Sequence, residues 1–202
     1  IMHGMGAFAG AIHSFSSGGC YHTMGDRPAA GICGSGLIDI VAYLVNRGII
    51  DREGHMAAEY TVVEAGRTAT GKPLLLTPAD VREVQLAKSA LCAGIKTLLS
   101  MAGLSVHALD ALYMAGGLGN YISVESAVAV GLIPAALKDK VIPVGNTSGM
   151  GAILALKSDH FDQVLEATRT KMQYIELSDS EVFVMEFAMN MSFGPILDEK
   201  DG

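Results

Sequence analysis

The stretch Asp110-Ala-Leu-Tyr-Met-Ala-Gly-Gly-Leu-Gly-Asn-Tyr121 joins an apolar run to a cluster of three glycines. The run from Asp110 to Ala115 predicts a strand, and glycines directly after a strand predict a tight turn. A glycine backbone carries no side chain that would keep a flat ligand away, and the free N–H groups of a following helix can face such a ligand. The turn therefore has two interpretations, a purely conformational one and a ligand-binding one.

Known nucleotide fingerprints do not decide between these two interpretations. The turn lacks the G-x-G-x-x-G spacing of dinucleotide-binding proteins and the Gly-Lys-Ser/Thr ending of a P-loop. A similar arrangement occurs again downstream, where the predicted strand Val141–Val144 runs into Gly145-Asn-Thr-Ser-Gly149 and then a helix. Two strands that end in glycine-rich turns indicate a ligand crevice at the carboxyl ends of strands in an α/β sheet.

The composition agrees with an α/β protein. Half of the 202 residues are hydrophobic and 24 are glycine, which suits a packed fold with many close turns. No repeat or linker divides the sequence, so we predict one compact domain over residues 1–202, in which residues 1–24 could complete an absent upstream part. The chain reads as a fragment of a longer protein.

Charge and cysteine content restrict the function. The net charge of −7 gives no general attraction to nucleic acid or to an anionic membrane. The longest nearly apolar stretch, Ala127 to Leu137, is too short to span a bilayer. Three scattered cysteines without C-x-x-C spacing are typical of a reducing cytoplasm and predict no zinc ribbon and no iron–sulfur cluster in this chain. We find no nucleophile–base pair and no histidines at metal spacing, so we assign no catalytic or metal-binding residue.

One helix is predicted with particular clarity. Thr77-Pro-Ala-Asp80 combines a cap, a proline at the first helical position and an early acidic residue, and Gly103 ends the helix. Its apolar stripe includes Val81, Val84, Leu91 and Leu98. Gln85 and Lys88 share a different face, which could hydrogen-bond a ribose or could simply be solvated.

Other segments carry weaker signals. Gly34-Ser-Gly36 opens a helix that Ser35 could cap, and it could bind an anion or pack closely. Asp39, Asp51 and Asp110 could take part in acid–base or metal chemistry, and each also suits a cap or a surface position. Tyr174–Leu177 reads as a strand, and Ser180–Met191 reads as a helix.

Five motifs in a fixed order resemble a known family. The motifs cover nearly the whole chain and are Gly31–Asp39, Val81–Ala90, Tyr113–Tyr121, Val144–Asn146 and Tyr174–Leu177. Together they are similar to the carboxy-terminal region of the ATP-dependent reductive activators of corrinoid proteins. The resemblance implies an α/β fold with a mixed sheet and flanking helices. This fold would be the C-terminal part of an actin-like (ribonuclease-H-like) ATPase, which belongs to the superfamily of actin, sugar kinases and heat-shock chaperones.

The resemblance also implies a function. Family members use ATP and an iron–sulfur centre to return the Co(II) corrinoid of a methyltransferase system to Co(I). It implies ATP, with Mg in the full-length protein, and a corrinoid-protein partner. It also implies an iron–sulfur cluster in the parent protein but not in this chain. Apart from the resemblance, the sparse cysteines favour a cytoplasmic location, and a homodimer is one possible state. The alternatives are a small-molecule kinase or dehydratase-activator type member of the superfamily, and a non-enzymatic docking or dimerisation module.

The same resemblance assigns site residues. The adenine would approach Gly116, Gly117 and Gly119, and the ribose would approach Gln85 and Lys88. Four further residues would line the nucleotide site, namely Gly34, Ser35, Gly36 and Asn146. Neither of the superfamily's two Asp-Gly phosphate hairpins occurs in the sequence, so we expect the chain alone to bind ATP weakly and to hydrolyse none.

Overall fold

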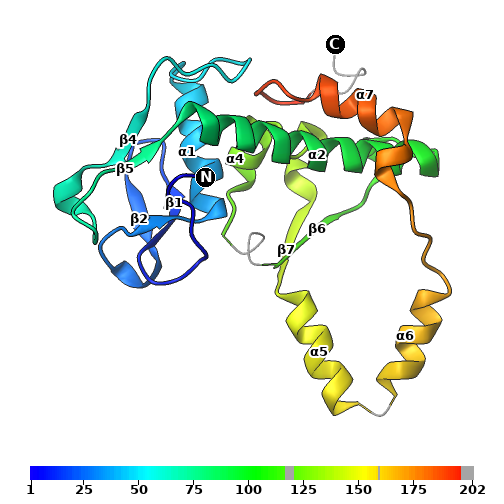
Figure 1. Cartoon of the computed structure of the whole chain (residues 1–202). Helices are drawn as coiled ribbons and strands as arrows, with labels where there is room; N and C mark the ends of the chain where they lie inside the picture. The colour runs from blue at the N-terminus through cyan, green and yellow to red at the C-terminus, as the bar shows by residue number, and fades with distance from the viewer. Residues whose placement is uncertain (117–120, 159, 197–202) are drawn as a thin grey trace.

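The computed structural model describes residues 1–116, 121–158 and 160–196, so Gly117 and Gly119 lie outside the described residues. The chain begins with a three-stranded sheet of order β2-β1-β3 (Figure 1). Its strands are β1 (Ala11–Phe15), β2 (Tyr21–Thr23) and β3 (Gly31–Ile32). β1 pairs antiparallel with β2 and parallel with β3, so this sheet is mixed.

A helix and a second sheet complete the first lobe. Helix α1 (Gly34–Asn46) packs against β1 and buries most of its residues. β4 (Tyr60–Val63) and β5 (Leu74–Leu76) form an antiparallel pair. The main core is centred on this lobe. Most of its buried side chains come from β1, α1, β4 and β5, and others are added by the start of α2 and by residues 127–137.

Helix α2 (Pro78–Ala102) confirms the helix predicted from Thr77 to Gly103. The Thr77 hydroxyl accepts from the N–H of Asp80 at 3.1 Å, and the Asp80 carboxylate accepts from the N–H of Thr77 at 3.0 Å. This capping box satisfies N–H groups that the first turn leaves unpaired. Gly103 ends the helix at a φ of 66°, in the left-handed region that glycine adopts without strain.

The second half of the chain is more extended. β6 (Leu112–Ala115) and β7 (Val141–Gly145) form a parallel pair, and α4 (Val124–Ala129) lies between them in sequence. α5 (Thr147–Lys157) and α6 (Phe161–Arg169) project away from the rest of the molecule (Figure 1) and bury none of their residues. α7 (Glu181–Met189), capped by Ser180, returns to lie along α2.

Short 3₁₀ segments connect these elements, at Met24–Asp26, Ala65–Arg67, Val106–Ala108, Ala135–Lys140 and Leu177–Asp179. Within the described part of the chain, no helix is both long and apolar enough to cross a membrane.

Two details of the sequence interpretation are wrong. Leu91 and Leu98 are about half exposed, because the second half of α2 packs against α7 through small residues such as Cys92, Ala93 and Thr97. Tyr174–Leu177 is not a strand. It pairs with no strand of the described residues, and side chains here hydrogen-bond locally instead, as from the hydroxyls of Tyr174 and Ser178 to Glu176.

Candidate functional site

The carboxyl ends of β6 and β7 lie side by side. In the parallel register, Leu112 is opposite Val141 and Ala115 is opposite Gly145. The glycine turn after β6 and the Gly145-Asn146 turn after β7 therefore begin at the same edge of this pair. This is the arrangement that two strand–turn–helix units predict for a ligand crevice.

Gly116 has the backbone conformation and the free space that a close ligand approach requires. Its φ is +88°, and a β-carbon built on it would meet no atom of the described residues within 4 Å. Because no packing contact with the described residues explains the absence of a side chain, two reasons for glycine remain. One is the left-handed turn itself, and the other is room for a ligand.

Asn146 is the N-cap of α5. Its Oδ1 atom accepts from the N–H of Gly149 at 3.0 Å, and the residue is exposed. The side chain thus fixes the start of α5 at the same edge as Gly116. In our proposal Asn146 lines the nucleotide site, although its Oδ1 atom is already engaged in the helix cap.

The N-terminus of α1 borders a hollow of about 260 Å³. Its lining comes from the N-terminal segment, the first turn of α1 and the end of the glycine turn, and consists of Met5, Gly6, Ala7, Cys33, Gly34, Ser35 and Tyr121. The Tyr121 ring lies 5.5 Å from the His13 ring of β1. Tyr121, the last residue of the glycine motif, therefore lines the same hollow as the first turn of α1, although the two motifs are far apart in the sequence.

The sequence interpretation assigned no role to Tyr121, although it stands at the end of the motif. An aromatic residue two positions after a glycine cluster could have indicated that it lines the site.

The two residues after Gly34 hold α1 against β1. Ser35 is not the helix cap, because Cys33 occupies that position. The Ser35 hydroxyl instead donates to the carbonyl oxygen of His13 at 2.8 Å. A β-carbon on Gly36 would overlap the carbonyl group of Ile12. Both positions therefore serve close packing, whereas Gly34 is exposed.

Gln85 and Lys88 do not lie on a solvated face, which corrects one of the two interpretations of the sequence. Their exposed fractions are 3% and 0%. Gln85 Nε2 donates to the carbonyl oxygens of Glu53 at 2.9 Å and Met191 at 3.1 Å. Lys88 Nζ donates to the carbonyl oxygen of Ser192. Both side chains hold the segment that follows α7.

Burial changes the acidity of Lys88. Loss of hydration lowers the pKa of its ammonium from 10.5 to about 8, and the nearby Cys92 side chain opposes this change. The Nζ atom also lies 5.6 Å from the centre of the Phe193 ring. No carboxylate of the described residues forms an ion pair with Lys88. Its charge is therefore balanced mainly by a carbonyl group and an aromatic face.

The cysteines do not form a set of metal ligands. Cys20 is exposed, and Cys33 and Cys92 are buried. Among the described residues, no group of three His, Cys, Asp or Glu side chains is placed to hold a metal ion.

Comparison with known proteins gives consistent results. Residues 1–198 match the family described as the C-terminal domain of RACo, the ASKHA domain. The protein named corrinoid activation enzyme RamQ of Eubacterium limosum is 32% identical over 218 residues, covering 95% of this chain and 36% of that protein. A solved structure named reductive activator for corrinoid, iron–sulfur protein aligns with a TM-score of 0.89 and 36% identity, covering 96% of this chain and 34% of that one.

These similarities confirm the expected fold class. The structural alignment extends over nearly the whole chain, and the matching family is an ASKHA domain. The chain spans about a third of the length of these two relatives.

Proposed function

This chain belongs to the family of C-terminal ASKHA domains of RACo, and from this premise we propose that it is the ATP-binding part of a reductive activator of corrinoid proteins. The whole protein would return the Co(II) corrinoid of a methyltransferase system to Co(I). ATP binding would favour one of two domain arrangements, and this coupling requires different ATP affinities in the two. The names of both relatives, a corrinoid activation enzyme and a reductive activator, support the proposal.

One structural observation carries the placement of the nucleotide. The turns after β6 and β7 start at the same edge, and Tyr121 connects the first of them to the N-terminus of α1. In our proposal the adenine lies against the glycine turn, at Gly116 and onward through Gly117 and Gly119. The exposed Gly34 and the capped start of α5 at Asn146 form the surrounding walls, and helix N-termini favour anionic groups.

The ribose contact proposed for Gln85 and Lys88 requires a conformational change. All donor groups that these residues use point to main-chain carbonyls of Glu53, Met191 and Ser192. Because both side chains are almost fully buried, either one must leave this packing to reach a ribose. We therefore propose that a ribose contact, if formed, is coupled to release of the segment after α7.

The electron and the metal ions would come from outside these residues. Reduction of Co(II) to Co(I) takes one electron, which we assign to an iron–sulfur centre in another part of the parent protein. Mg²⁺ would accompany the ATP phosphates in the full-length protein. The corrinoid protein is the proposed partner, and a cytoplasmic location and a homodimer also remain proposals.

The experiment is a titration of the 202-residue chain with a fluorescent ATP analogue. We expect weak, saturable binding without hydrolysis, because the sequence contains no phosphate hairpin. Gly116→Leu should abolish binding, since its side chain would occupy the space against which the adenine lies. Gly71→Leu is the matched control, because Gly71 also has a positive φ of 67° and no atom within 4 Å of a built β-carbon.

Two results would contradict this assignment. If Gly116→Leu binds the analogue as the unmodified chain does, the adenine does not lie at Gly116 and the docking-module interpretation gains support. If the unmodified chain binds ATP tightly or turns it over, the phosphate-binding groups must be present within these residues.

A further inference from the structure

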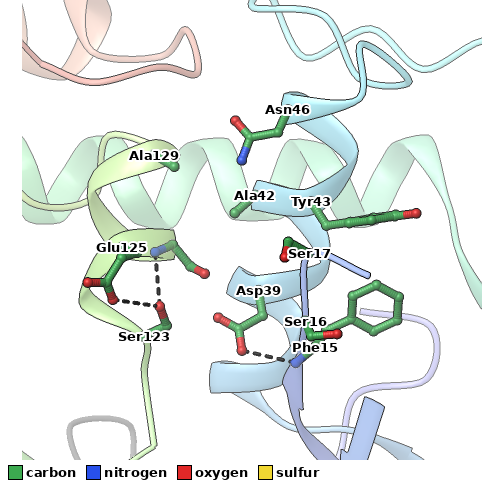
Figure 2. A pocket seen from close by; sticks show the side chains of 11 residues that line it. Phe15, Ser16, Ser17, Asp39, Ala42, Tyr43, Asn46, Ser123, Glu125 and Ala129 are labelled. Atoms are coloured by element: carbon green, nitrogen blue, oxygen red, sulfur yellow. Dashed lines mark hydrogen bonds between the residues drawn. The ribbon is translucent and has the colours of Figure 1, made fainter. Parts of the chain in front are cut away.

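A second cavity lies between α1 and α4, beside the turn that joins β1 to β2. Its volume is about 380 Å³, within the range of small-molecule sites. It shares no lining residue with the hollow at the N-terminus of α1. Figure 2 shows the lining residues, which are Phe15, Ser16, Ser17, Asp39, Ala42, Tyr43, Asn46, Ser123, Glu125, Ser126 and Ala129.

Asp39 extends from α1 toward α4 in this cavity (Figure 2). The residue is only 4% exposed. Its Oδ2 atom accepts from the N–H of Phe15 at 3.0 Å. Its Oδ1 atom is buried and has no partner at hydrogen-bond geometry within the described part of the chain, although the Ser126 hydroxyl is near enough to lower the pKa of this carboxyl. A buried carboxylate oxygen without a donor is costly, so the site favours a ligand that supplies one.

The environment of Asp39 is short of positive charge. Burial raises the pKa of Asp39, although the Ser126 hydroxyl, the Phe15 N–H and His13 each act to lower it. Glu125 adds a second carboxylate to the lining, and none of the described lining residues is Lys, Arg or His.

Two cations near the cavity do not form an ion pair with Asp39. The Nζ atom of Lys138 lies 4.0 Å from a carboxylate oxygen of Glu125, and both side chains are largely solvated. Arg47 stacks on the Tyr43 ring at 5.2 Å from its centre. The cavity therefore presents two carboxylates, hydroxyl groups and one carboxamide, and no cation of the described residues forms an ion pair with Asp39.

We propose that this cavity binds an organic cation, an ammonium or guanidinium group, whose N–H groups donate to Asp39 Oδ1 and to the hydroxyl and carboxamide oxygens around it. Such a group carries several donors and a single positive charge, which the lining lacks. It could be a free small molecule or the Lys or Arg side chain of another protein. The site is independent of the proposed nucleotide contacts.

The test is an NMR titration of the 202-residue chain with n-propylguanidinium and n-butylammonium. We expect saturable shifts of the amide signals of Phe15 and Ala42, and no comparable shifts with the neutral n-propylurea and 1-butanol. Asp39→Asn should weaken the binding about tenfold or more, because it removes one charge-assisted hydrogen bond. Glu59→Gln, an exposed glutamate outside the cavity, should change nothing.

A second variant guards against a folding defect in Asp39→Asn. Ala129→Leu places extra carbon atoms in the cavity while Asp39 stays intact, and it should also abolish the shifts. To separate the two sources, an arginine-containing pentapeptide is compared with n-propylguanidinium. Tighter binding of the peptide indicates a side chain of a partner protein, and equal or weaker binding indicates a free small molecule.

Three results would overturn the proposal. These are an absence of saturable shifts, equal binding of the neutral analogues, or equal binding by Asp39→Asn. An experimental structure with the Ser126 hydroxyl on Asp39 Oδ1 and only water in the cavity would point the same way. Asp39 would then serve only to fix the backbone of Phe15.

Discussion

Lys88 offers the sharpest test of the packing between α2 and the segment after α7. Its ammonium is fully buried and donates to the Ser192 carbonyl. Burial lowers its pKa from 10.5 to about 8. We expect the stability of the chain to depend on pH in this range, and Lys88→Met should remove that dependence because methionine has no titratable group.

The sign follows from proton binding. Between pH 8 and pH 10.5 the unfolded chain holds a proton on Lys88 that the folded chain lacks. The free energy of unfolding therefore rises with pH across this window. Below pH 8 both states are protonated, and the full cost of burying the charge remains. At about 1.4 kcal/mol per pKa unit, this cost is about 3 kcal/mol.

The assay is denaturant unfolding of the unmodified chain and of Lys88→Met at a series of pH values. The difference in unfolding free energy between the two should change by about 3 kcal/mol in favour of the unmodified chain from pH 8 to pH 10.5. Lys72→Met is the control, because Lys72 is exposed and its removal should leave the pH dependence intact. The ¹³Cε signal of Lys88 should titrate near pH 8.

A pH-independent difference between the two proteins would refute this reasoning. It would mean that the Lys88 ammonium keeps its ordinary pKa, either because water reaches it or because a carboxylate pairs with it. The proposed attachment of the segment after α7 would then need a different explanation.

Further substitutions test the capping, the packing and the polar contacts of several helices. Thr77→Ala should lower the unfolding free energy by about 1 kcal/mol, because it removes the capping box. Ser105→Ala, at a cap position without a side-chain bond, should have little effect. Gly36→Ala should lower the unfolding free energy by about 3 kcal/mol or more, because its β-carbon overlaps the Ile12 carbonyl. Gly151→Ala in α5, where a β-carbon meets no atom of the described residues within 4 Å, should raise it by up to about 1 kcal/mol. Thermal unfolding of both variants measures these opposite changes. Gln85→Leu should cost about 1–3 kcal/mol, since it leaves the Glu53 and Met191 carbonyls without their donor. It should also increase hydrogen exchange in residues 187–193, while Glu83→Leu on the exposed face should not.

The sequence could predict elements whose signals are local. The start of α2 depends on Thr77 and Asp80, which are three residues apart and bond to each other. Its end depends on the positive φ of Gly103. The strand and glycine turn at 110–116 are likewise adjacent in the chain. The order of five motifs added the family, because several motifs in sequence are more specific than any one of them.

Only the tertiary structure decided which partners the polar side chains meet. Gln85, Lys88 and Ser89 bond to carbonyls about a hundred residues later, and Asp39 bonds to Phe15 across 24 positions. Helical periodicity places side chains on a face, but it does not say whether water, a ligand or another segment covers that face. The same limit explains Leu91 and Leu98, whose spacing predicted burial. The sequence by itself thus determined the local elements and the family, and the burial of Lys88 and Asp39 emerged only when distant segments packed together and displaced water from them.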